Sequence, residues 1–299
     1  MKCAAIDIGT NTILLLIVQK RGELFTDIVD ASTIVRLGED LVRSGSLKEE
    51  AVSRTINGLR NYLNIAASNG VGKIFCIGTA ALRTARNGRD FVASVKDMLG
   101  LDIEIISGRD EAYYTYLSIR NDALMKYADM TIVDIGGGST EIVNGTDGQF
   151  AGYVSLPIGS VVLTDSYVSH DPPLPVELEN IASFIGENLA NVPFSPASTL
   201  IGTGGTVTNI AALILGLKQY DKSIIHGYTI RFEDLKDLIA SLSPLTSARR
   251  KDMPGMEAGR EDIIVEGSMI LDEVMMHGGF DACVVSAAGV RYGLLYERC

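Results

Sequence analysis

The chain has 299 residues, of which 46% are hydrophobic and 21% are charged, a balance typical of a soluble α/β protein with room for two domains. Its formal net charge of −11 argues against a nucleic-acid-binding protein, which would carry a basic surface. No apolar run reaches the roughly 18 residues that a membrane-spanning helix needs, and Asp7 interrupts the first apolar stretch too early for a signal peptide. We therefore expect a cytoplasmic protein that binds neither nucleic acid nor membrane.

The spacing of the cysteines and histidines indicates neither a redox motif nor a metal site. Cys3, Cys76, Cys283 and Cys299 show no C-x-x-C pattern, and the three histidines are far apart. Three of the cysteines lie in or beside apolar runs, which favours buried free thiols over disulfides or metal ligands. The histidines lack the spacing of a zinc site.

In the first half of the chain, predicted strands alternate with predicted helices. Residues 4–18 read as a strand, a tight turn and a second strand. Ser46 and Glu49 have capping-box spacing before a helix that ends near Gly70. Further strands are expected at 24–29, 32–36, 73–78 and 103–106, and further helices at 90–99 and 112–124.

The second half repeats this alternation. Strands are expected at 130–135, 141–143, 152–156, 199–202 and 282–286, and helices at 176–189, 205–216, 261–276 and 289–297. The alternation indicates an α/β architecture, and we expect two domains, 1–120 and 121–299. The basic triplet Arg249-Arg250-Lys251 reads as a solvated helix face or, alternatively, as part of a track that binds a polyanion.

One pattern occurs twice, 127 positions apart: Ala5-Ile6-Asp7-Ile8-Gly9-Thr10 is echoed by Val133-Asp134-Ile135-Gly136-Gly137-Gly138-Ser139-Thr140. Glycine lets the backbone approach an anion and direct N–H groups at it, and the Asp can hold a divalent metal, usually through water. A third glycine loop, at 202–206, follows a strand and opens a helix, whose first N–H groups bind anions. Each loop alone could be an ordinary turn, but the three together predict a phosphate site.

In this order the loops resemble the actin-like (ribonuclease H-like) fold of sugar kinases and heat-shock ATPases. More specifically, the chain resembles the exopolyphosphatase and guanosine pentaphosphate phosphohydrolase (Ppx/GppA) family over essentially its whole length. This resemblance implies an α/β fold of two actin-like domains with an inter-domain cleft, and it suggests a homodimer. It is carried by residues 5–11, 79–83, 107–108, 111–112, 134–141, 155–159, 204–206, 226–227, 286 and 289–291.

The resemblance implies that Glu111 is the general base on the attacking water. Asp110 has a sufficient structural explanation, because it has capping-box spacing with Ser107. The alternative for Glu111 is a solvated carboxylate in the first turn of a helix, favoured by the helix dipole. Arg83 is expected to act in catalysis, since a guanidinium matches phosphate oxygens, or else to be a surface arginine.

Metal and phosphate ligands follow from the same resemblance. Mg²⁺, or another divalent metal, would be held by Asp134 and Glu141, directly or through water, with Asp7 as a further ligand, although Glu141 could equally be an exposed strand residue. The other residues expected to bind the substrate's phosphates are Thr10, Asn11, Thr12, Gly136, Gly137, Gly138, Ser139, Thr140, Gly204, Gly205 and Thr206. His226 matches the family without a role that can be assigned, and Arg291 is open between ligand and structural residue.

The expected reaction is the hydrolytic removal of a terminal phosphate from inorganic polyphosphate or from guanosine pentaphosphate. Longer family members carry an extra C-terminal helical domain, which we do not expect in this protein. We therefore expect short polyphosphates and nucleotide anhydrides to be at least as plausible as long chains. One alternative is a kinase that needs an acceptor, which would release no phosphate without one. Another is a non-catalytic nucleotide or polyphosphate sensor, which would bind without turnover.

Overall fold

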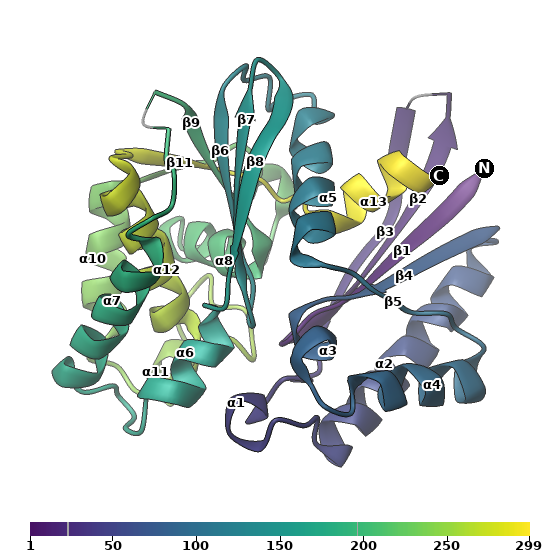
Figure 1. The fold of residues 1–299 in the computed structure, drawn as a ribbon, viewed down its shortest axis with the longest axis horizontal. Coiled ribbons are helices and arrows are strands. Elements are labelled where there is room, and N and C mark those ends of the chain that lie inside the picture. Colours follow the sequence, from purple (N-terminus) through teal and green to yellow (C-terminus); the bar gives the residue numbers. More distant parts are fainter. Residues whose placement is uncertain (23, 196) are drawn as a thin grey trace. The chain divides into compact units, whose positions relative to one another are not determined.

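The computed structural model describes residues 1–22, 24–195 and 197–299 (Figure 1). They divide into two units, one made of Met1–Ser118 with Val290–Cys299, the other of Ile119–Gly289. Residues 290–299 therefore group with the N-terminal unit, whereas the sequence placed them in the second domain. Among the described residues, no helix is both long enough and apolar enough to cross a membrane.

The N-terminal unit is built on a five-stranded sheet. Its strands are β1 (Lys2–Ile8), β2 (Thr12–Arg21), β3 (Leu24–Ile34), β4 (Lys73–Gly78) and β5 (Glu104–Ile105), in the order β3-β2-β1-β4-β5. The first three strands pair antiparallel, and β4 and β5 add in parallel. Its helices are α1 (Leu41–Ser44), α2 (Glu49–Ser68), α3 (Ala80–Thr84), α4 (Gly88–Leu99), α5 (Gly108–Arg120, which crosses the unit boundary) and α13 (Val290–Arg298).

Helix α2 begins later than the sequence indicated. Lys48 is its N-cap and makes no side-chain cap hydrogen bond, so the predicted capping box at Ser46 is wrong. The helix buries a face that includes Ile56 and Leu59. It packs closely on β2, because a Cβ at Gly58 would lie 2.5 Å from Ile13 Cδ1. Each large aliphatic side chain buried in this way stabilises the fold by about 1.5–3 kcal/mol.

The C-terminal unit is built on a six-stranded sheet. Its strands are β6 (Met130–Ile135), β7 (Thr140–Thr146), β8 (Gln149–Leu156), β9 (Thr199–Thr203), β10 (Thr229–Arg231) and β11 (Ala282–Val285), in the order β10-β11-β9-β6-β7-β8. Its helices are α6 (Ser160–Tyr167), α7 (Pro175–Leu189), α8 (Gly204–Ile214), α9 (Lys222–Ile225), α10 (Phe232–Leu242), α11 (Ser247–Lys251) and α12 (Ile264–Gly278). Helix α12 is buried along almost its whole length.

The two sheets share one topology over five strands, and β10 adds a sixth strand to the C-terminal sheet. In each unit the first strand, β1 or β6, pairs antiparallel with the next strand and in parallel with a later one, β4 or β9. The meander β6-β7-β8 repeats the meander β1-β2-β3. The two glycine loops that look alike in sequence therefore occupy equivalent places, each between the first two strands of its sheet.

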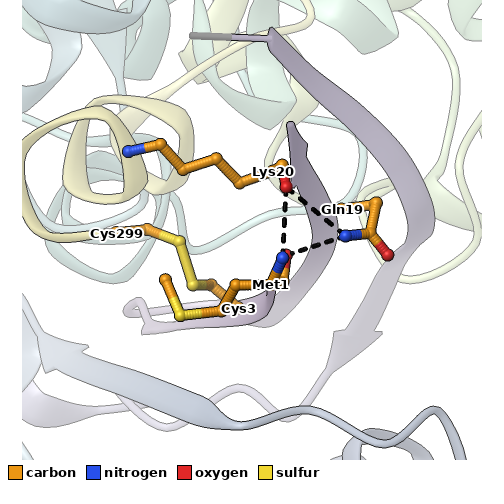
Figure 2. The surroundings of a disulfide bond; sticks show 5 residues. All are labelled: Met1, Cys3, Gln19, Lys20 and Cys299. Atoms are coloured by element: carbon orange, nitrogen blue, oxygen red, sulfur yellow. Dashed lines mark hydrogen bonds between the residues drawn. A yellow bond between two sulfur atoms is a disulfide. The ribbon is translucent and has the colours of Figure 1, made fainter. Parts of the chain in front are cut away.

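A disulfide joins the two ends of the chain within the N-terminal unit. Cys3 on β1 is bonded to Cys299, 296 residues away, with a Cα–Cα distance of 6.4 Å. Figure 2 shows the bond near Met1, whose carbonyl accepts a hydrogen bond from Gln19 Nε2 at 3.1 Å. The expectation of free thiols is wrong for this pair, because α13 returns to β1 and brings together cysteines that are remote in sequence.

The other two cysteines are buried free thiols, as expected. Burial raises the pKa of the Cys76 thiol well above its ordinary value, with the nearby Asp7 carboxylate adding to the effect. Burial likewise raises the pKa of Cys283 to about 12. Both thiols therefore stay protonated and unreactive at neutral pH.

The basic triplet is not a uniformly solvated face. It lies on the short helix α11, where Arg250 is 2% exposed. Its Nε donates to the carbonyl of Leu242 at 3.1 Å, and its Nη1 donates to the carbonyl of Glu261 at 2.9 Å. Arg250 therefore anchors α11 into the C-terminal unit, and the expectation of solvent exposure is wrong for this residue.

Candidate functional site

The loop between β1 and β2 is held by its own backbone. Thr10, Asn11 and Thr12 are 6%, 6% and 8% exposed. Gly9 N donates to the Thr12 carbonyl at 3.0 Å, and the Thr10 carbonyl accepts from Gly38 N at 2.8 Å. The predicted phosphate-binding residues of this loop are thus placed together, in a rigid turn at the end of β1.

Glu111 and Arg83 lie against each other in the N-terminal unit. Arg83, on α3, donates through Nη1 to Glu111 Oε2 at 3.1 Å and to the Ile106 carbonyl at 2.9 Å. Glu111, in the first turn of α5, is 8% exposed. The structure therefore brings these two predicted catalytic residues together, and the guanidinium fixes the position of the carboxylate.

The neighbouring Asp110 has the structural role that the sequence indicated. Its Oδ2 accepts from Ser107 Oγ at 2.7 Å, and its N–H donates to Ser107 Oγ at 3.2 Å. Ser107 N adds a longer bond to the same carboxylate at 3.3 Å. This reciprocal pair forms the predicted capping box of α5, and it separates the roles of two adjacent acids.

Asp134 and Glu141 face each other across β6 and β7. They are direct partners in the antiparallel register, and residues opposite each other in such a pair project from the same face of the sheet. Glu141 is 1% exposed, and its Oε1 accepts from Ser155 Oγ on β8 at 2.7 Å. Glu141 is therefore a buried, oriented carboxylate and not an exposed strand residue.

The equivalent position in the N-terminal unit carries no second acid. Asp7 lies opposite Leu14 in the β1–β2 register, where Asp134 lies opposite Glu141. The repeated loops have thus diverged in their chemistry, since the C-terminal copy alone presents two carboxylates opposite each other. Asp7 belongs to the other unit, and its expected place as a third metal ligand stays a prediction.

The three-glycine loop is fastened to the start of α6. The carbonyl of Gly136 accepts from Ser160 N at 3.0 Å, and the carbonyl of Gly137 accepts from the N–H groups of Val161 and Val162 at 3.0 and 3.1 Å. A Cβ at Gly159 would lie 2.5 Å from the Gly137 carbonyl. Because its carbonyls are hydrogen-bonded to the helix, the loop has a fixed backbone conformation. Successive backbone N–H groups in such loops can bind anions.

The polar residues that follow this loop are also placed beside it. Ser139 is 6% exposed, and Thr140 is fully buried, with its Oγ1 donating to the Ile158 carbonyl at 2.7 Å. Thr140 therefore holds the loop to the segment before α6, which is a supporting role and not a direct contact with an external phosphate.

The third glycine loop lies beside Asp134. Gly204 has φ +92°, and a Cβ there would lie 2.8 Å from Asp134 Oδ1, so only glycine fits. Gly204, Gly205 and Thr206 form the first turn of α8, where backbone N–H groups and the helix dipole favour an anion. The structure thus brings two predicted phosphate loops and Asp134 to the same end of one sheet.

Sequence reasoning missed Arg260, which lies over this loop. A Cβ at Gly205 would be 2.1 Å from Arg260 Nη2. Arg260 is 7% exposed and donates through Nε to Glu257 Oε2 at 2.5 Å. Its position places a cation against the start of α8. No local pattern around Arg260 indicates this, because the contact depends on the path of the chain between α11 and α12.

The donor set fits a divalent metal at Asp134 and Glu141. Mg²⁺ is usually bound by one or two carboxylates, with water and substrate phosphates completing its shell. Two opposed carboxylates beside two glycine loops offer that combination. Within residues 1–22, 24–195 and 197–299, no cluster of three or more His, Cys, Asp or Glu side chains is arranged to hold a metal ion.

Arg291 and His226 both make internal contacts. Arg291 donates through Nη1 to the Leu15 carbonyl at 2.9 Å and to Asp30 Oδ1 at 2.7 Å, which ties α13 to β2 and β3. His226 Nε2 lies 3.2 Å from Asp122 Oδ2. The question that the sequence left open for Arg291 is thereby answered in favour of a structural residue.

Comparison with known proteins places this arrangement in a family. Residues 16–299 match the model of the Ppx/GppA phosphatase family. "Exopolyphosphatase 2" of Mycobacterium tuberculosis is 32% identical over 311 residues, which cover 98% of this chain and 97% of that protein. The crystal structure of the Aquifex aeolicus member of the Ppx/GppA family has a TM-score of 0.84 at 30% identity and covers 99% of this chain and 97% of its own.

A second solved structure agrees. An exopolyphosphatase from Cytophaga hutchinsonii has a TM-score of 0.90 at 25% identity, covering 99% of this chain and 97% of its own. With the repeated sheet topology, these similarities confirm the predicted α/β fold of two actin-like domains. The chain belongs to the Ppx/GppA phosphatase family.

Proposed function

We propose that this protein hydrolyses phosphoanhydride bonds and releases the terminal phosphate of inorganic polyphosphate. The observation that carries the proposal is the pair Asp134 and Glu141, opposed in register beside the three-glycine loop. Relatives named exopolyphosphatase that align over nearly the whole chain favour polyphosphate as the substrate class. Guanosine pentaphosphate has the same anhydride chemistry and is the second substrate to be tested.

Glu111 is proposed to act as the general base. A phosphoanhydride needs a water held in line, a base that orients it, and donors for the charge that develops on the phosphoryl oxygens. The 3.1 Å hydrogen bond from Arg83 holds Glu111 in one orientation. The adjacent residue Asp110 forms the helix cap. Glu111 would accept the proton of the attacking water, a contribution typically worth about 10²–10⁴-fold.

The glycine loops are proposed to bind the phosphoryl oxygens. The N–H groups of Gly137 and Gly138 and those at the start of α8 would be the donors. The bonds that hold the Gly136 and Gly137 carbonyls to α6 support a loop that is fixed before substrate arrives, as electrostatic stabilisation of a transition state requires. A divalent metal, held by Asp134 and Glu141, would supply positive charge to the phosphate oxygens when bound. Ser155 would keep Glu141 in the orientation needed for that role.

The test measures phosphate release from short polyphosphate, long polyphosphate and guanosine pentaphosphate with Mg²⁺. We expect Glu111→Gln to lower kcat by about a hundredfold or more and Asp134→Asn to lower it with a weaker response to Mg²⁺. Asp110→Asn is the matched control, since it changes the adjacent carboxylate and leaves Glu111 in place. Similar losses in Asp110→Asn and Glu111→Gln would contradict a specific role for Glu111.

The same assay separates the alternatives. A kinase would release phosphate only when an acceptor is added. A sensor would bind polyphosphate with equal affinity in wild type and Glu111→Gln, with no turnover in either. Phosphate release by the wild type without an acceptor would therefore exclude both.

A further inference from the structure

Both ring nitrogens of His226 are engaged within the C-terminal unit. The N–H of Ala287 donates to Nδ1 at 3.2 Å, and Nε2 lies 3.2 Å from Asp122 Oδ2. Because a backbone N–H can only donate, Nδ1 is the acceptor, and the proton of the neutral ring is on Nε2 and is donated to Asp122. This is a defined tautomer with one function for each nitrogen.

The backbone that follows His226 is hydrogen-bonded to β11. Gly227, the next residue, has φ +84°, and its N–H donates to the Val285 carbonyl at 2.8 Å, while Val285 N donates to the Tyr228 carbonyl at 2.8 Å. The His226 side chain is only 16% exposed. The imidazole is thus a fixed link and not a mobile surface group.

The two partners of His226 lie where the chain enters and leaves the C-terminal unit. The chain enters after Ser118 and leaves after Gly289. Asp122 follows the entry closely, and its Oδ1 also accepts from Leu124 N at 2.8 Å. Burial acts to raise the pKa of Asp122, but hydrogen bonds from His226 and from the N–H groups of Leu124 and Met125 prevail and lower it.

The exit segment is connected in turn to the third glycine loop. Ser286 Oγ accepts from Ala288 N at 3.1 Å, and Ser286 N donates to the Gly202 carbonyl at 2.8 Å. The Ala288 carbonyl accepts from Thr203 Oγ1 at 2.9 Å. Thr203 directly precedes Gly204, so a short series of bonds runs from His226 to the base of the loop that begins α8.

We propose that His226 is a positioning residue that ties the entry segment to the exit segment and thereby holds the third glycine loop in its phosphate-binding form. This role rests on the proposed function, since the loop is taken to bind substrate phosphate. In the described part of the chain, the His226 side chain bonds to Asp122 and Ala287, so it would act on the loop through Ala287, Ala288 and Thr203. We name the three residues Asp122, His226 and Ala287 the His226 tether.

The test divides the two bonds among three variants. In His226→Asn the side-chain oxygen keeps an acceptor near the place of Nδ1, and in His226→Gln the amide keeps a donor near the place of Nε2. His226→Leu keeps neither. His277→Leu is the matched control, because His277 is an exposed histidine of the same unit, on α12, outside the tether.

Hydrogen exchange gives a readout that does not depend on activity. We expect the amide of Ala287 to exchange roughly five- to tenfold faster in His226→Leu and His226→Gln than in wild type, as loss of one hydrogen bond implies. His226→Asn and the His277 control should keep the wild-type rate. Unchanged exchange in His226→Leu would overturn the tether, whether or not the protein hydrolyses polyphosphate.

Kinetics then separate positioning from general stability. We expect His226→Leu to raise KM for polyphosphate by about tenfold with a much smaller change in kcat. His226→Asn keeps the bond to Ala287 but loses the bond to Asp122, so it should raise KM as well while Ala287 keeps its wild-type exchange rate. Equal KM values in wild type and His226→Leu, in protein that releases phosphate, would overturn the positioning role and leave the proposed function standing. If the wild type releases no phosphate, the proposed function fails, while the exchange result still decides the tether.

Discussion

Glu266 is a buried acid whose replacement should stabilise the protein at neutral and alkaline pH. It lies on α12 and is fully buried, and its Oε2 accepts a hydrogen bond from Thr164 Oγ1 at 3.2 Å. Burial raises its pKa from 4.5 to about 7, against the opposing effects of its own backbone N–H and the Arg250 guanidinium. The change we consider is Glu266→Gln, which keeps the shape and removes the ionisation.

The magnitude follows from the difference between folded and unfolded protein. A raised pKa means that the folded state keeps its proton up to about pH 7, while the unfolded chain ionises from about pH 4.5 upward. The stability of the wild type therefore falls between these pH values and stays lower above them. At about 1.4 kcal/mol for each pH unit between the two pKa values, the loss is about 3 kcal/mol.

The assay is thermal unfolding of wild type and Glu266→Gln between pH 5 and pH 8. The variant should gain stability relative to wild type as the pH rises, by about 3 kcal/mol, which is about 6–12 °C in melting temperature for a unit of this size. Arg250 keeps its bonds to the Leu242 and Glu261 carbonyls in the variant. Glu187→Gln, on the exposed side of α7, is the matched control for loss of one negative charge.

Only the pH-dependent part of the stability difference between wild type and Glu266→Gln reports the ionisation of Glu266. Any change in packing made by the amide appears at every pH, and it shifts the whole curve without changing its slope. If the melting curves of wild type and Glu266→Gln run parallel from pH 5 to pH 8, Glu266 does not titrate in this range and the reasoning from its burial is refuted.

Three further predictions concern backbone positions and thiols. Gly204→Ala should lose phosphate release, because its Cβ would lie 2.8 Å from Asp134 Oδ1. The control is Gly216→Ala, which is also at positive φ but has nothing within 4 Å of its Cβ, so it should lose only about 1 kcal/mol of stability and keep activity. Equal activities of the two variants would contradict the crowding at Asp134. Gly293→Ala should lower the melting temperature strongly, since its Cβ would lie 1.7 Å from the Tyr114 carbonyl, and an unchanged melting temperature would disprove that contact. Unfolded protein should show only the thiols of Cys76 and Cys283 before reduction and all four cysteines after it; four thiols without reductant would show that Cys3 and Cys299 are not bonded.

Local patterns were sufficient for most elements and for the positions of the glycine loops. The β-branched run that ends at Asp134 and the three glycines after it predicted a strand and a tight loop, which the structure has as β6 and the turn into β7. The Ser107–Asp110 capping box was also correct. These features depend on residues a few positions apart, whose backbone preferences and hydrogen bonds act within one turn of chain.

Other elements were misplaced because two local preferences competed. Ser46 and Glu49 have the spacing of a capping box, yet α2 begins at Glu49 with Lys48 as its N-cap. The backbone of Ser46 is held in the turn that follows α1, because the Ser44 hydroxyl donates to the Ser46 carbonyl at 2.8 Å and accepts from Ser46 N at 3.2 Å. A serine hydroxyl can bond the backbone of a turn as readily as it can cap a helix, and here the turn made by Ser44 holds Ser46 outside the helix.

What the sequence alone determined is the order of strands and helices, the repeated Asp-glycine turns and the family to which they belong. Tertiary structure alone decided the Cys3–Cys299 bond, the contact of Arg291 with Asp30, the burial of Arg250, and the place of Arg260 over Gly205. The physical reason is the distance along the sequence between the interacting residues. A turn or cap is stabilised by neighbours in the chain, whereas a buried charge or a disulfide depends on partners that only the path of the whole fold brings within bonding distance.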